Sequence, residues 1–368
     1  MSILRKRLYD FNIDWGLFIV IAILLILGIV MTYSSSAVKG MLYYDNKYHF
    51  FFMQLLWVAM GLVAMAVAAG MDIRLLWRWA KVLFIVSLVL LLLVKVPGLG
   101  RSVNGANRWI GLGPLSIQPS EVIKIAMVVI AAKVLTQTKD FHVFRKGMLP
   151  TLLIMGLVCG LVMLQPDLGT TLVIAATVCI MLVVAGARVK HLVLLGGAGV
   201  GLMTMAILAA PYRMKRIFAF IDPWADPSGN GYQTIQSLLA LGPGGLFGLG
   251  LGQSRQKFLY LPENHTDFIF AMIGEELGFI GGCFVILLFF LFIWRGFRLA
   301  MHVREPFMSL LAVGLTSLIG VQAMVNMGVV SGLLPVTGIT LPFLSYGGTS
   351  LIFTMIGAGL LLNISREL

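Results

Sequence analysis

Acidic residues beside apolar segments are the clearest candidates for catalytic or binding residues in this sequence. The stretch LPENHTDFIFAMIGEELGFIGG, residues 261–282, holds Glu263, Asp267, Glu275 and Glu276. If a helix starts after Thr266, its residues turn by about 100° each. Glu276 then points away from Asp267, and Glu275 lies roughly 12 Å deeper at 1.5 Å per residue. These acids cannot act as a pair. We expect Glu275 and Glu276 to face the interior of a helix bundle. Asp267 either caps the N-terminus of its helix, where the helix dipole favours a negative charge, or acts as a base.

A second polar cluster is NGANRWIGLGPLSIQPSEVIKIAM, residues 104–127. Glu121 and Lys124 are three residues apart and therefore share one helix face. They form either a plain ion pair or, because ionisable residues inside a membrane are costly, a functional site. Arg108 offers a guanidinium that suits a phosphate, and Trp109 offers an aromatic plane for a sugar. The cluster indicates a binding site for an anionic sugar derivative.

Two further motifs lie at turns between apolar segments. MLQPDLGTT, residues 163–171, contains Gln165 and Asp167, and Asp167 either caps the following helix or belongs to a site. LPVTGITLPFLSYGGTS, residues 334–350, places Ser345 near the start of the last apolar segment. His265 lies between two acids, but one histidine on such a loop leaves metal binding a minor alternative.

The elements that must position these residues are membrane helices. The chain is 59% hydrophobic and 11% charged, whereas soluble proteins have roughly 25% charged residues. A membrane helix needs about 20 apolar residues. Segments that qualify are 15–35, 50–70, 75–96, 118–136, 148–164, 168–187, 191–210, 267–294, 307–330 and 340–364. The first has a basic start but no cleavage site, so we interpret it as a retained helix. We predict an all-α polytopic protein with one domain over residues 1–368.

Basic residues predict the sidedness of these helices. Sixteen lysines and arginines fall on the side of the N-terminus, whereas the opposite short loops hold only Lys39, Lys47, Arg101 and Arg108. The positive-inside rule then places both termini in the cytoplasm. The long loop 211–266 lies outside, and loops of that length are usually functional or disordered. We expect it to be ordered, with a short amphipathic helix over 232–241, and to cover an outer site.

Several function classes are excluded or disfavoured. The net charge of +12 follows from cytoplasmic basic loops, and no basic run is interleaved with aromatics, so nucleic-acid binding is not expected. Cys159, Cys179 and Cys283 lie in apolar runs without metal-binding spacing. GLGLG at 248–252 does not follow a strand and is no dinucleotide motif. The polar clusters gather on the outer half of the bundle, which favours a cavity for an amphiphilic, anionic substrate.

The motifs GANRWIGLGPLSIQPSE, QPDLGT, PENHTDFIFAMIGEELG and LPVTGITLPFLSYGGTS closely resemble the SEDS family (shape, elongation, division and sporulation), above all its FtsW and SpoVE branch. The resemblance implies a ten-helix peptidoglycan glycosyltransferase of the bacterial cytoplasmic membrane. Such enzymes polymerise lipid II at the outer face, in division or spore cortex synthesis, beside a class B penicillin-binding protein that cross-links the glycan. The family's essential aspartate falls on Asp267, and its polar cavity positions fall on Arg108, Glu121, Lys124 and Asp167.

The resemblance also implies a mechanism. Asp267 would take the proton from the C4 hydroxyl of the acceptor sugar as it attacks the anomeric carbon. Arg108 and Lys124 would stabilise the departing pyrophosphate, with Glu121 orienting Lys124. A first-turn position would make Asp267 too acidic for a good base. The alternatives are that this turn is unwound or that Asp267 binds a divalent cation, Mg²⁺ or Mn²⁺; no other cofactor is expected.

Two other functions remain open at this point. A lipid II flippase would need access to both leaflets, but the sequence shows no paired broken helices in its two halves. A non-catalytic scaffold would only recruit the penicillin-binding protein. A scaffold would tolerate Asp267→Asn, whereas a polymerase would lose turnover and keep its fold.

Overall fold

The predicted helical segments are present in the protein's structure, a computed structural model that describes residues 13–96, 100–103, 106–111, 116–138, 144–208 and 211–367. The helices that match the predicted segments are α2 (Trp15–Tyr44), α3 (His49–Gly70), α4 (Ile73–Leu93), α5 (Pro119–Gln137), α7 (Leu149–Met163), α8 (Leu168–Val184), α9 (Val189–Leu208), α12 (Ile269–His302), α13 (Pro306–Val330) and α14 (Gly348–Ser365). Shorter helices are α6 (Phe144–Gly147), α10 (Pro211–Ile221), η1 (Pro223–Ala225) and α11 (Tyr232–Leu241).

Length and composition identify the chain as a multi-pass membrane protein. Within the described ranges, six helices are long and apolar enough to cross a bilayer: α2, α3, α4, α12, α13 and α14. The helices α7 and α8 are apolar but shorter. The predicted helical membrane class is therefore confirmed.

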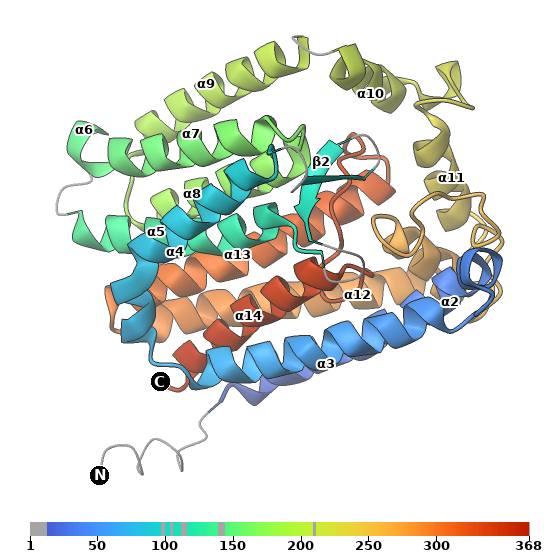
Figure 1. Cartoon of the computed structure of the whole chain (residues 1–368), viewed down its shortest axis with the longest axis horizontal. Helices are drawn as coiled ribbons and strands as arrows, with labels where there is room; N and C mark the ends of the chain where they lie inside the picture. Colours follow the sequence, from blue (N-terminus) through green and yellow to red (C-terminus); the bar gives the residue numbers. More distant parts are fainter. Residues whose placement is uncertain are drawn as a thin grey trace.

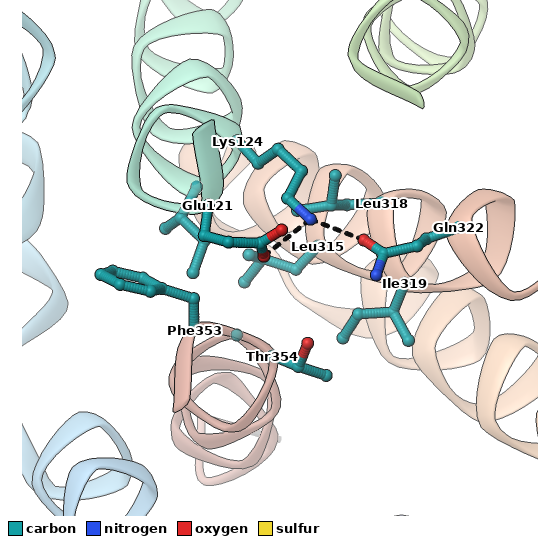
Figure 2. Close-up of a pocket in the computed structure, with 10 residues that line it drawn as sticks. Glu121, Lys124, Leu315, Leu318, Ile319, Gln322, Phe353 and Thr354 are labelled. Atoms are coloured by element: carbon teal, nitrogen blue, oxygen red, sulfur yellow. Dashed lines mark hydrogen bonds and ion pairs between the residues drawn. The ribbon is translucent and has the colours of Figure 1, made fainter. Parts of the chain in front are cut away.

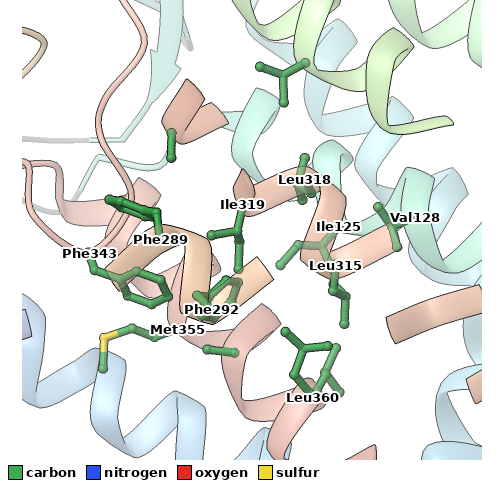
Figure 3. Close-up of a cluster of buried hydrophobic side chains, with 14 of the residues drawn as sticks. Ile125, Val128, Phe289, Phe292, Leu315, Leu318, Ile319, Phe343, Met355 and Leu360 are labelled. Carbon is green, nitrogen blue, oxygen red and sulfur yellow. The ribbon is translucent and has the colours of Figure 1, made fainter. Parts of the chain in front are cut away.

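Helix α13 forms the centre of the bundle. It packs against α5, α8, α12 and α14, while α3 lies along α14 and α2 lies along α12 (Figure 1). A helix that is apolar on all sides is one that other helices surround. Side chains from several of these helices interdigitate around Leu315 and Ile319 (Figure 3). In the same cluster, the rings of Phe292 and Phe343 meet edge to face, with centroids 5.8 Å apart.

Helix α12 is broken at Gly278, which has φ 69° and ψ −166°. A glycine-rich segment of the preceding loop docks at the break. Phe279 N–H donates to Gly245 O (2.8 Å), and Leu249 N–H donates to Glu275 O (3.0 Å). A Cβ at Gly278 would lie 2.3 Å from Gly248 N, so only glycine fits this close approach. The break therefore ties residues 245–249 to the membrane helix.

The loop 211–266 is described over its whole length and is ordered, as predicted. The short helix α11 spans Tyr232–Leu241, which confirms the predicted 232–241. Helix α10 was not predicted. Its apolar residues alternate with Arg213, Lys215 and Arg216, so it lacks a continuous apolar run.

A two-stranded sheet lies between α4 and α5, where no strand was predicted. Strand β1 (Gly100–Val103) pairs antiparallel with β2 (Ala106–Ile110). An Asn-Gly pair at 104–105 separates the strands in the sequence, and this dipeptide is a strong hairpin signal. The strands, of four and five residues, are too short for a periodic pattern to be noticed between two long helices.

Two predicted helix starts are wrong. Helix α12 begins at Ile269 with Phe268 as its N-cap, so Thr266 is not the cap and Asp267 is outside the helix. Helix α14 begins at Gly348 rather than at 340. Pro342 lies between the two positions, and a proline disfavours helical backbone in the residue before it.

Candidate functional site

A cavity of about 1160 Å³ opens at the end of the bundle that carries β2 and α11. Its wall combines aromatic side chains with charged ones. The predicted site residues Arg108, Trp109, Glu121, Lys124, Asp167 and Asp267 all line it. These residues come from β2, α5, the start of α8 and the segment before α12. The sequence-predicted constellation is therefore brought together, with the exceptions of Gln165 and Ser345 described below.

Asp267 is half-buried at the cavity wall, two residues before α12 begins. Gly338, at φ 74°, lies against its carboxylate: a Cβ there would be 3.6 Å from Asp267 Oδ2. Burial, together with the negative charges of Glu263 and Asp167, raises the pKa of Asp267 from 3.8 to about 7, against the opposing effect of Arg108 and Arg216. A carboxylate with such a pKa is suited to general-base catalysis near neutral pH.

Glu121 and Lys124 form the expected ion pair inside the bundle. Lys124 Nζ lies 2.8 Å from Glu121 Oε2 and donates to Gln322 Oε1 at 2.7 Å (Figure 2). Both side chains are buried, with relative exposures of 5% for Lys124 and 6% for Glu121. A buried charge is tolerated when it is paired and hydrogen-bonded. Lys124 therefore remains a fixed cation at the cavity wall.

Arg108 is anchored by the turn that precedes α8. Its Nε donates to Gln165 O at 3.0 Å, and Nη2 donates to Pro166 O. Nη1 lies 3.9 Å from Asp167 Oδ2. Asp167 also caps α8, because its Oδ1 accepts from Thr170 N at 3.0 Å. The two readings of Asp167, helix cap and cavity residue, are thus both correct.

Gln165 and Ser345 are not part of the cavity wall. The side-chain Nε2 of Gln165 donates to Leu91 O at 2.9 Å. Ser345 Oγ donates to Thr266 O at 2.6 Å and accepts from Leu341 N at 2.8 Å. Both side chains hold backbone segments next to the cavity. Their predicted contact with a substrate does not follow from this geometry.

His265 is enclosed by aromatic rings. Its ring centroid is 4.9 Å from that of Phe50 and 5.6 Å from that of Tyr346. Burial lowers the pKa of His265 to about 3, so it is neutral at physiological pH. It supports the shape of the wall beside Asp267.

Glu275 and Glu276 are buried, as expected for acids that face the bundle. The Glu275 carboxylate accepts from Ser254 Oγ and from Arg255 N, the latter at 2.8 Å. The Glu276 carboxylate accepts from Ser34 Oγ at 2.6 Å. These acids fasten the loop 211–266 to α12 and α2 and do not line the cavity.

Sequence reasoning missed Gln322 and Asn326 of α13. Gln322 lines the cavity, and Asn326 Nδ2 donates to Asp267 O at 2.7 Å. A signal was available, since two amides four residues apart share one face of an otherwise apolar helix. The aromatic wall residues Phe50, Trp57 and Tyr346 were also missed because nothing in their spacing separates them from ordinary membrane-helix residues.

No resident metal centre is built from the described residues. Among them, no group of three or more histidine, cysteine, aspartate or glutamate side chains could hold an ion. Asp267 has two acidic neighbours in charge range, Glu263 and Asp167, but Asp167 is already engaged with Thr170 and Arg108. The side chains present do not fit a metal ion held by protein ligands alone.

Comparisons with known proteins identify the family of this chain. A model of the cell cycle protein family that groups FtsW, RodA and SpoVE matches residues 14–368. Stage V sporulation protein E of Bacillus subtilis is 50% identical over 96% of this chain and 97% of its own length. The probable peptidoglycan glycosyltransferase FtsW of Trichlorobacter lovleyi is 42% identical over 100% of this chain and 97% of its own length.

Solved structures share the fold. A chain from a peptidoglycan synthase complex that coordinates polymerisation and crosslinking superposes with a TM-score of 0.79, at 34% identity, covering 96% of this chain and 98% of that one. The rod shape determining protein RodA of Thermus thermophilus gives a TM-score of 0.72 at 32% identity, covering 96% and 97%. Sequence and fold together show that this chain belongs to the FtsW/RodA/SpoVE family of cell cycle proteins.

Proposed function

We propose that this membrane protein is a peptidoglycan glycosyltransferase that polymerises lipid II into glycan strands. The observation that carries the proposal is a single cavity in which a carboxyl with a pKa of about 7, Asp267, meets the cations Arg108 and Lys124. Relatives with the name peptidoglycan glycosyltransferase support it. A proton acceptor beside fixed cations matches a reaction in which a hydroxyl attacks and a pyrophosphate leaves.

In the proposed reaction, the C4 hydroxyl oxygen of one lipid II attacks C1 of the sugar at the end of the growing chain. The new C1–O4 bond forms as the bond between C1 and the pyrophosphate oxygen breaks. Asp267 accepts the hydroxyl proton, and the pyrophosphate leaves with the electron pair of the broken bond. The fixed positive charges of Arg108 and Lys124 stabilise that developing charge, and Glu121 with Gln322 holds Lys124 in place.

Trp109 and the aromatic wall would contact the sugars, because a flat aromatic ring packs against a sugar face. If Mg²⁺ or Mn²⁺ takes part, it would arrive with the pyrophosphate, since Mg²⁺ commonly binds through substrate phosphates. Gln165 and Ser345 would contribute indirectly, because each holds a backbone segment next to the site. Asp167 would hold Arg108 at the cavity.

The topology that this function needs is ten spans, formed by α2, α3, α4, α5, α7, α8, α9, α12, α13 and α14 in one domain. Both termini would lie in the cytoplasm and the loop 211–266 at the outer face. Two observations support an even number of spans: the excess of basic residues on the terminal side, and the hydrogen bond from Asp14 N to Ser365 Oγ at 3.1 Å. The bacterial cytoplasmic membrane is the location that fits the substrate.

The partner would be a class B penicillin-binding protein, a transpeptidase that cross-links the new strand. The structural relative from a peptidoglycan synthase complex supports a partner of this kind. The proposed process is cell division or spore cortex synthesis, which the family description, cell cycle protein, and the relative with the name stage V sporulation protein E support.

The test is a reconstitution of the purified protein and its partner in liposomes that contain fluorescent lipid II. A polymerase produces long glycan that lysozyme digests. If lipid II instead crosses the bilayer and no polymer forms, the protein is a flippase. If neither happens alone but a separate polymerase is stimulated, it is a scaffold. Either outcome would refute the proposal.

A further inference from the structure

The backbone around Asp267 is held from outside its own helix. Three consecutive carbonyls accept hydrogen bonds from the region 326–346: His265 O from Tyr346 N (2.9 Å), Thr266 O from Ser345 Oγ (2.6 Å) and Asp267 O from Asn326 Nδ2 (2.7 Å). These residues precede α12, and buried carbonyls need partners. The path of the chain at Asp267 is therefore set by α13 and the segment that follows it.

Asn326 is the centre of this arrangement. It is 1% exposed, and its Nδ2 donates both to Asp267 O and to Ile339 O, each at 2.7 Å. Ile339 follows Gly338, the residue that lies against the Asp267 carboxylate. One side chain thus fixes both the backbone of Asp267 and the wall that its carboxylate faces.

Gln322 makes the corresponding contacts one helical turn earlier. Its Nε2 donates to Thr340 O at 3.0 Å, and its Oε1 accepts from Lys124 Nζ at 2.7 Å. Figure 2 shows Gln322 reaching Lys124 from α13, opposite Glu121. Residues four apart lie on the same helix face. The polar face of α13 therefore contacts Lys124 at one position and Asp267 at the next.

We propose that Gln322 and Asn326, with Ser345 at the adjacent carbonyl of Thr266, are positioning residues that fix Asp267 and Lys124 relative to each other. The inference rests on the proposed function, in which these two groups act on the attacking hydroxyl and the leaving pyrophosphate. They come from different elements, Asp267 from before α12 and Lys124 from α5, so neither element alone can set their separation. Misplacement of about 1 Å in such a pair costs on the order of a hundredfold in rate.

The amide type suits this task. An amide NH₂ offers two hydrogens, which Asn326 uses on two carbonyls, and it carries no charge that would need a partner. Replacement by alanine leaves two buried carbonyls without donors. The segment 265–267 would then relax towards water at the cavity.

A pH profile distinguishes positioning from general support of the fold. The charged groups that shift the pKa of Asp267 are Glu263, Asp167 at the N-cap of α8, Arg108 on β2 and Arg216 on α10. Release of the segment hydrates the carboxyl, so its pKa falls from about 7 towards 3.8. The acidic limb of kcat/KM against pH then moves to lower pH while kcat falls. A loss of folded protein would instead lower the rate by the same factor at every pH and leave the acidic limb in place.

The protein contains a matched control in α14. Asn363 is also buried, and its Nδ2 also donates to two carbonyls, Ala68 O at 2.8 Å and Met71 O at 2.6 Å. It does not line the cavity. Asn326→Ala and Asn363→Ala therefore remove the same pair of bonds at two different places.

The experiment measures glycan synthesis by the purified complex from pH 5 to 9, together with the melting temperature. Both variants should lose thermal stability. Only Asn326→Ala should lower kcat by roughly ten- to a hundredfold. In this variant the acidic limb of kcat/KM against pH should move to lower pH, and KM should change less than kcat does. Equal profiles for the two variants would overturn the proposal.

Ser345→Ala is a milder second variant if Asn326→Ala does not fold. It removes the donor to Thr266 O and should lower kcat with little change in KM, whereas loss of a substrate contact would raise KM. An unchanged kcat in folded Ser345→Ala would contradict the proposal. If Asp267→Asn retains full activity, the proposed function has failed; if only the Asn326 and Ser345 variants behave as wild type, this inference alone has failed.

Discussion

At the residue scale, the position of Asp267 decides its chemistry. The sequence suggested a first-turn position, where the helix dipole would keep the carboxyl acidic. Because α12 begins at Ile269, Asp267 lies outside that helix, and burial among acidic neighbours raises its pKa to about 7. The unwound turn, one of the alternatives from the sequence, is what the structure contains.

This pKa predicts a cost in stability. Between pH 4 and 7 the unfolded chain releases the Asp267 proton and the folded protein retains it, so the free energy of unfolding falls as pH rises through this window. The amide that Asp267→Asn introduces does not titrate, so this variant escapes the cost. Asp267→Asn should therefore melt close to wild type at pH 4 and above it at pH 8, as measured by thermal scanning in detergent.

Asp226 supplies the control for that prediction. Hydrogen bonds from Asn230 lower the pKa of Asp226 below its usual value. Any effect of its ionisation on stability is therefore confined to pH values below about 4. Asp226→Asn should show no gain that grows between pH 4 and 8. If Asp267→Asn also shows none, the raised pKa of Asp267 is wrong.

At the scale of elements, hydropathy predicted the helices well because each membrane helix needs a long apolar run. It failed where local chemistry prevails: at the β1–β2 hairpin, at the amphipathic α10, and at the starts of α12 and α14. The cavity residues Arg108, Glu121, Lys124, Asp167 and Asp267 were found from charge in an apolar context. Gln322 and Asn326 were missed because neutral amides give a weaker signal.

The break in α12 leads to a second prediction. Gly278→Ala places a methyl group 2.3 Å from Gly248 N at a positive φ, so the docked segment 245–249 must move. A strained backbone of this kind costs about 1–3 kcal/mol. We expect a lower melting temperature and faster proteolysis within residues 242–256.

Gly282→Ala is the matched control, one turn further along the same helix. A Cβ there meets only Phe270 Cζ, at an ordinary distance of 3.7 Å. This variant should melt as wild type does. Equal stability of the two variants would show that the docked loop contributes little.

At the scale of the whole molecule, the proposed ten-span topology can be tested by cysteine labelling. In a background without Cys159, Cys179 and Cys283, Glu367→Cys reports on the end of α14 and Ser228→Cys on the exposed part of the outer loop. A membrane-impermeant maleimide should label Ser228→Cys in intact spheroplasts, and Glu367→Cys only after permeabilisation. Labelling of both in intact spheroplasts would contradict the three spans proposed between them, α12, α13 and α14, and the cytoplasmic C-terminus.

The proposed polymerisation of glycan requires Asp267 as its base. The decisive measurement is the initial rate of polymer formation from labelled lipid II, at a pH of about 7.5, where the Asp267 carboxyl with its pKa of about 7 is mostly ionised. It compares the wild-type complex with the complex that carries Asp267→Asn. General-base catalysis contributes about 10²- to 10⁴-fold, so the variant should lose at least a hundredfold in rate while it melts at or above the wild-type temperature. Polymer formation at the wild-type rate by folded Asp267→Asn would contradict this role of Asp267.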